Sequence, residues 1–189
     1  TGHSNTAVGK NALVANTTGA NNTVVGKAAG ATMTTAGNNT AIGTEALQQT
    51  TTGANNTGIG YAALKVNTTG TENNALGALA GDAITTGSYN TLIGNSAGTA
   101  LTTGDTNLAI GNATLATATT ADGNVAIGHS ALTASTTGAL NTAVGTNALD
   151  ANTTGSDNVA IGRSTLTTST TASDNVAVGS SALESTTTG

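Results

Sequence analysis

Asn39-Thr40-Ala41-Ile42-Gly43 is the stretch that decides the fold, because ten related stretches follow the same pattern along the chain. Each copy ends on a glycine, and consecutive glycines lie 17 residues apart. Val, Ile or Leu precedes every one of these glycines, and an Asn stands four residues before each. A fixed period of this length predicts a solenoid or fibre. The eleven anchor glycines are Gly9, Gly26, Gly43, Gly60, Gly77, Gly94, Gly111, Gly128, Gly145, Gly162 and Gly179.

The composition agrees with a thin, elongated core. The 189 residues include no Phe, Trp, Cys or Pro, and Tyr61 and Tyr89 are the only aromatic residues. A rounded core needs large side chains at its centre, whereas Ala, Val, Ile and Leu can fill only a narrow space. We therefore predict an all-β fold in which residues 1–189 form a single repeat domain, a parallel β-solenoid of eleven 17-residue rungs.

The residues before each glycine predict a short strand, since β-branched residues such as Thr40 and Ile42 favour extended backbone. These two residues share one face, and the residue between them points to the other. That middle column contains no polar residue, so both faces are expected to be covered, one by the interior of the coil and one by a partner chain. The predicted inter-chain face is represented by Ala41, Ala109, Ala126, Ala143 and Ala160.

The Asn column predicts a ladder of stacked amides. An Asn at the entry to a strand can bond neighbouring backbone and the Asn of the next rung. Asn39, Asn56, Asn124, Asn141 and Asn158 represent this structural ladder. The glycine column fits a turn that needs positive φ or close packing of backbone.

The second half of each rung is expected to be a helical turn or bent loop. Most rungs carry Leu four residues after the anchor glycine, but three carry Gly30, Gly81 or Gly98 there. In those rungs alone, a large apolar residue appears three positions later, as Met33, Ile84 and Leu101. Two positions three apart share a face on a turn and not on a strand. Two Thr columns follow; one is expected to stack its hydroxyls outside, while the other caps a turn or packs its methyl inside.

No catalytic constellation or cofactor motif is evident, and we predict a protein that is not an enzyme and binds no cofactor. His129, Ser130 and Asp122 permit a Ser-His-Asp hypothesis, but adjacent side chains on a rung diverge. Asp157 and Asp174 could stack around a calcium ion, although solvated surface carboxylates explain them equally well. The net charge of −5 argues against nucleic-acid binding. No apolar run approaches 18 residues, so membrane insertion is not expected.

Asn124-Val125-Ala126-Ile127-Gly128, Asn158-Val159-Ala160-Ile161-Gly162 and Asn175-Val176-Ala177-Val178-Gly179 resemble the head repeats of trimeric autotransporter adhesins. The combined pattern also resembles repeat arrays of phage tail fibres and related bacterial surface fibres. This resemblance covers the whole chain and implies a left-handed β-roll that forms a homotrimer about the fibre axis. It implies an extracellular location on a cell surface or virion. The rung of 17 residues is longer than the usual rung of such adhesin heads.

The expected function is a structural or adhesive fibre segment that projects or presents a surface for a host glycan or matrix protein. Because Thr1-Gly2 and Gly189 share one phase, we expect a window from a longer fibre, with end-to-end neighbours covering the open edges. Two alternatives stay open. One is a self-assembling extracellular filament, and the other is an ice-binding solenoid that uses the Thr-Thr columns.

Overall fold

The computed structural model describes residues 2–187, which form one stack of short strands joined by turns. Thr1 and Gly189, which set the phase of the two ends, lie outside the described residues. The part described contains no helix. The strands are β1 (Thr6–Val8), β2 (Thr23–Val25), β3 (Thr40–Ile42), β4 (Thr57–Ile59), β5 (Asn74–Leu76), β6 (Thr91–Ile93), β7 (Leu108–Ile110), β8 (Val125–Ile127), β9 (Thr142–Val144), β10 (Val159–Ile161) and β11 (Val176–Val178).

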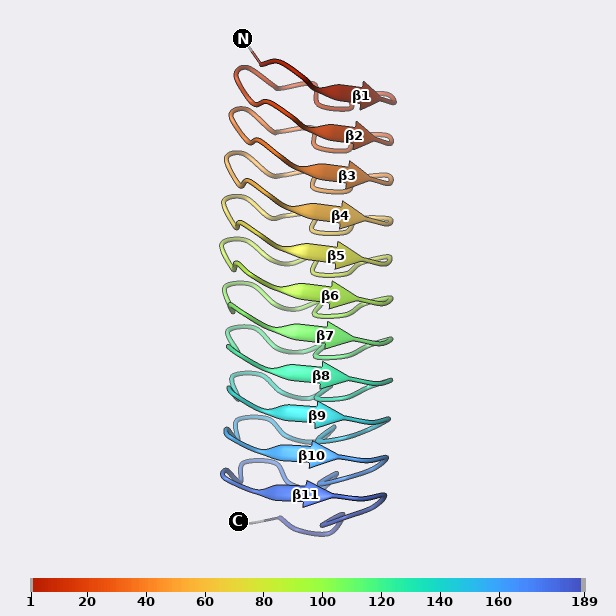
Figure 1. Cartoon of the computed structure of the whole chain (residues 1–189), viewed down its shortest axis with the longest axis vertical. Helices are drawn as coiled ribbons and strands as arrows, with labels where there is room; N and C mark the ends of the chain where they lie inside the picture. The colour runs from red at the N-terminus through yellow and green to blue at the C-terminus, as the bar shows by residue number, and fades with distance from the viewer. Residues whose placement is uncertain (1, 188–189) are drawn as a thin grey trace.

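The predicted parallel β-solenoid is confirmed. All eleven strands belong to one parallel sheet in sequence order, and each pairs with its neighbour at an offset of one period, as in Ala41 opposite Gly58. Each strand runs along the front of the coil and the chain returns behind it while descending, which is a left-handed path (Figure 1). At a strand spacing of about 4.8 Å, the rod is about 50 Å tall.

The anchor glycines are fixed by two constraints, which Gly43 illustrates. Its φ of 138° lies where L side chains are strained, and a Cβ placed on it would lie 2.3 Å from the carbonyl oxygen of Gly60 in the next rung. The strand can therefore turn at this point and still stack closely on its neighbour. Only glycine meets both requirements.

The return path of each rung is a chain of tight turns. In the third rung, the amide of Ala46 donates to the carbonyl of Gly43 at 3.3 Å, and that of Gln48 donates to Glu45 at 3.3 Å. The amide of Leu47 instead donates to Ala63 of the next rung at 3.0 Å, although Leu47 has a φ of 49°. This path confirms the predicted bent loop, while its left-handed leucines were not foreseen.

The middle residue of each strand points inward, which corrects the predicted inter-chain face. Ala41, Ala109, Ala126, Ala143 and Ala160 are each 0% exposed within a single chain, so they line its own core and cannot meet a partner. The error was to place the flanking residues inside. The core is so thin that leucines from the return path already reach the sheet, and only a small residue such as Ala fits beneath them.

The three displaced leucines behave as the sequence predicted. Met33, Ile84 and Leu101 are completely buried and supply volume that the glycines four residues after the anchors do not. The structure adds a second source of volume. A Cβ on Gly98 would lie 2.9 Å from Leu92 Cδ2, so the bulky middle residue of β6 occupies the space left by that glycine. Large and small residues thus alternate across the core.

Candidate functional site

The Asn column forms a continuous buried ladder, as predicted. Asn39 Nδ2 donates to the Gly53 carbonyl at 3.0 Å, and its Oδ1 accepts the backbone amide of Asn56 at 2.9 Å. The same inter-rung amide bond links Asn124 to Asn141 at 2.9 Å. All five predicted ladder residues, which also include Asn158, are at most 1% exposed. Their polar groups are therefore engaged in structure and are closed to ligands.

The two Thr columns divide their work. The first hydroxyl of each pair donates to the carbonyl of the corresponding residue one rung on, as Thr51 Oγ1 does to Thr68 O at 3.0 Å. The second Thr of the pair, such as Thr52 or Thr69, is exposed. One column thus ties rungs together, and the other forms a single outward rank of hydroxyls. The ice-binding hypothesis depends on that one rank.

The tentative Ser-His-Asp group is not assembled. Asp122 precedes β8 and His129 follows it, so an extended strand separates them. Asp122 Oδ1 instead accepts the backbone amide of Asp105 at 2.7 Å, which fixes it in a turn between rungs. His129 is exposed beside its strand end. The carboxylate and imidazole cannot act together within one chain.

The stacked carboxylates do not form a metal site. Asp157 and Asp174 are both exposed at the same turn of successive rungs. Within residues 2–187, no group of three or more His, Cys, Asp or Glu residues could hold a metal ion. The pair fits the alternative of solvated surface charges. The one acidic group whose environment raises its pKa through burial is Asp150, on the return path.

The outer face of the sheet, which we define as the first and third residues of β1–β11, is the largest unusual surface. Its third column is aliphatic in every strand, and the exposed fraction reaches 57% at Val8 and 67% at Val178. None of its residues is charged. Contiguous apolar surface of this kind marks interaction sites in soluble proteins. The partner-facing surface is therefore the opposite side of each strand from the one predicted.

A shallow groove lies on the return path of rungs two to four. It has a volume of about 530 Å³ and is lined by Ala31, Thr32, Gln48, Gln49, Thr51 and Thr68. Gln48 and Gln49 are the only glutamines in the chain. The amide of Gln49 donates to the carbonyl of Lys65 at 2.8 Å, which places the groove beside Lys65 in the next rung. The groove therefore offers amides and hydroxyls that recur nowhere else in this combination.

Lys65 and Glu45 form an ion pair next to this groove, with Nζ and Oε2 2.8 Å apart. The hydrogen bond from Lys65 and its charge lower the pKa of Glu45, and the hydrogen bond to Glu45 raises the pKa of Lys65. Both side chains are in solvent, so the pair adds little stability. Tyr61 stands at the start of the same rung and is 54% exposed. Together these residues form a mixed polar and aromatic surface without net charge, which the sequence analysis did not single out.

No helix of the described chain has the length and apolar character needed to span a membrane. Comparison with family models, with curated proteins and with solved structures finds no match.

Proposed function

We propose that this chain is a segment of an extracellular fibre on a cell surface or virion, where it acts as a rigid, non-catalytic spacer and presents an adhesive surface. The observation that carries the proposal is the unbroken stack of eleven strands in one register. Because each rung bonds only its neighbours, the fold grows in length without growing in width. Ladder side chains that could do chemistry are already bonded within the rod.

The proposal includes a homotrimer, with the outer face of each sheet turned toward the other chains. This face is aliphatic and uncharged, and it extends along the whole stack. A second copy of the same chain has the same repeat spacing, so aliphatic columns of two copies can match over the full height of about 50 Å. An unrelated globular partner would lack that match.

Sedimentation analysis and electron microscopy test this proposal on the same preparation. We expect a species of three 17.9 kDa chains that appears as a straight rod. A stable monomer at micromolar concentration would contradict the homotrimer. Rounded or flexible particles would contradict the spacer.

For the adhesive surface, we propose that the groove on rungs two to four and the adjacent Tyr61 contact a host glycan. Amides and hydroxyls can bond sugar hydroxyls, and an aromatic ring can cover the apolar side of a sugar. The local charges cancel in the Lys65–Glu45 pair, which suits a neutral saccharide.

A pair of tyrosine variants tests the glycan surface. Tyr61→Ala is expected to lower binding to neutral oligosaccharides on an array by about tenfold, as loss of one aromatic contact of roughly 1.4 kcal/mol would do. Tyr89→Ala is the matched control, because Tyr89 is 56% exposed but precedes its strand at the opposite edge of the rod. Equal loss in both variants, or in neither, would remove the groove from the proposal.

A further inference from the structure

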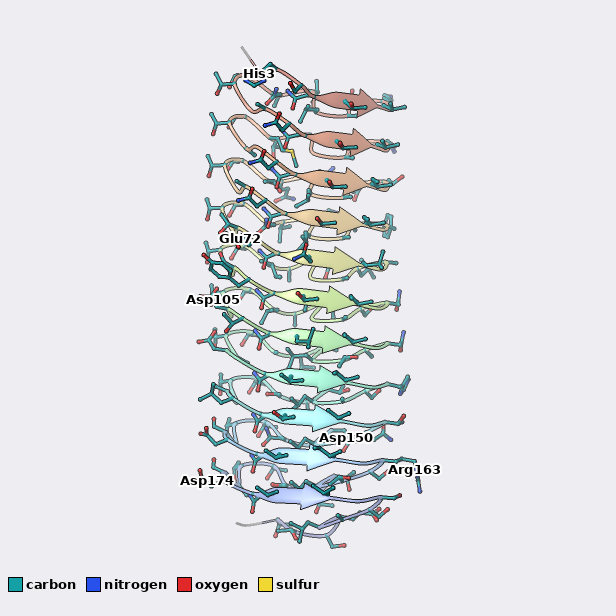
Figure 2. All side chains as sticks on the ribbon, viewed as in Figure 1. His3, Glu72, Asp105, Asp150, Arg163 and Asp174 are labelled. Carbon is teal, nitrogen blue, oxygen red and sulfur yellow. The ribbon has the colours of Figure 1, made fainter. Side chains whose placement is uncertain are left out.

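Charged residues are sorted to opposite edges of the sheet. The acidic edge consists of turn residues just before the ladder asparagines, and the basic edge consists of the residues directly after the anchor glycines. Figure 2 shows Glu72, Asp105 and Asp174 along one edge and Arg163 on the other. All members of both edges are exposed. The acidic edge is Glu72, Asp105, Asp122, Asp157 and Asp174, and the basic edge is Lys10, Lys27, His129 and Arg163.

Between these edges, the outer face is most apolar at the C-terminal end. In β7, β8, β10 and β11, the first strand position holds Leu or Val in place of the Thr that is common earlier, which gives two aliphatic columns side by side. The six residue steps from one edge to the other span about 20 Å, so a face about 50 Å tall covers about 1,000 Å². A standard protein interface needs about 800 Å² on each partner.

We infer that the outer face meets a second copy of this chain in parallel and in register, with the acidic edge of one chain beside the basic edge of the next. Asp157 and Arg163 flank the same strand, β10, and Asp122 and His129 flank β8. Both members of each pair therefore lie at one height on the rod. When two copies stand side by side at equal height, Arg163 of one lies beside Asp157 of the other.

Other arrangements lose this match. An antiparallel copy centred on β6 sets β10 against β2, where the residues of the acidic edge are the neutral Ala20 and Asn21. Because the two edges differ, the contact is heterologous and closes into a ring without forming an isologous dimer. The inference thus rests on the proposed homotrimer and specifies its direction and register. Buried aliphatic columns supply affinity, while exposed charge pairs mainly select the partner's orientation.

Charge reversal at β10 tests the inference in the full chain. Arg163→Glu would place a second acid beside Asp157 of the neighbour, and we expect association to weaken by about tenfold at low salt, the equivalent of about 1.4 kcal/mol. The double variant Asp157→Lys/Arg163→Glu is expected to recover association, because it restores opposite charges with the signs exchanged. Lys10→Glu is the matched control and should change nothing, since no acid stands at its height on the opposite edge. Sedimentation equilibrium at low and high salt gives the measurement.

A second pair of variants tests the face itself. Ile161→Lys places a charge on the third column of β10, and association should be lost at every salt concentration, whereas Thr154→Lys on the exposed threonine rank should leave it intact. Circular dichroism would show that each variant keeps its fold. An oligomer that is indifferent to both Arg163→Glu and the double variant would overturn the edge pairing and leave the homotrimer standing. A monomeric wild-type chain would overturn both.

Discussion

Asn124→Ala is expected to lower the free energy of unfolding by about 4 kcal/mol, because it leaves two or more buried polar groups without partners at about 1–3 kcal/mol each. Asn124 Oδ1 accepts the backbone amide of Asn141 at 2.9 Å, and its Nδ2 donates to the Gly138 carbonyl at 3.0 Å. Alanine replaces neither bond, and the site is closed to water. Chemical denaturation followed by circular dichroism measures the loss.

Asn112→Ala provides the control for the ladder. Asn112 is exposed and lies outside the buried column, where its Nδ2 donates to Asn95 Oδ1 at 3.3 Å. We expect a change within about 0.5 kcal/mol there, as at most surface sites. Equal stability of the two variants would mean that the ladder does not hold the rungs together.

Gly43→Ala is expected to be at least as costly, at roughly 4 kcal/mol, because strained backbone and a steric clash are added together. The new Cβ would lie 2.3 Å from the Gly60 carbonyl oxygen at a φ of 138°. Relief requires the third and fourth rungs to separate, which would break the adjoining sheet bonds. Hydrogen exchange should therefore show faster exchange at β3 and β4 than at distant strands, in addition to a lower denaturation midpoint.

Gly37→Ala is the matched control in the same rung. A Cβ on Gly37 would lie 3.2 Å from the nearest atom, the Ala20 carbonyl oxygen, and its φ is outside the strained region. Alanine already stands at the corresponding positions Ala20 and Ala54. This variant should keep the stability of the parent. If Gly43→Ala were equally harmless, the anchor glycines would not be fixed by close stacking.

The glycine column that follows the Thr pairs shows how much a column can reveal without coordinates. It holds Gly in most rungs and Ala36, Ala121 and Ala172 in three, which predicts a need for small size over a left-handed backbone. The structure agrees, since Gly53 in this column has no positive φ, while a Cβ on it would lie 2.4 Å from the Gly70 carbonyl oxygen.

The candidate sites were less accessible to sequence reasoning. The alternation of Thr40, Ala41 and Ile42 shows that two faces exist, but it does not say which of them is inside. The groove was missed because its residues vary between rungs, and variable positions give no column to interpret. A useful signal was nevertheless available, since Gln48, Gln49 and Tyr61 are rare residue types concentrated in neighbouring rungs.

By itself, the sequence determined the period, the parallel strands, the Asn ladder and the exchange of Leu for Met33, Ile84 or Leu101, because each follows from a repeated position and local stereochemistry. Only the tertiary structure decided that Ala41 faces the core and Ile42 faces outward. That choice depends on the distance between the sheet and the return path, which the left-handed turns at Leu47 and its equivalents set. A narrow gap accepts alanine beneath leucine and turns the larger aliphatic residues to the surface, where they form the face proposed for a second chain.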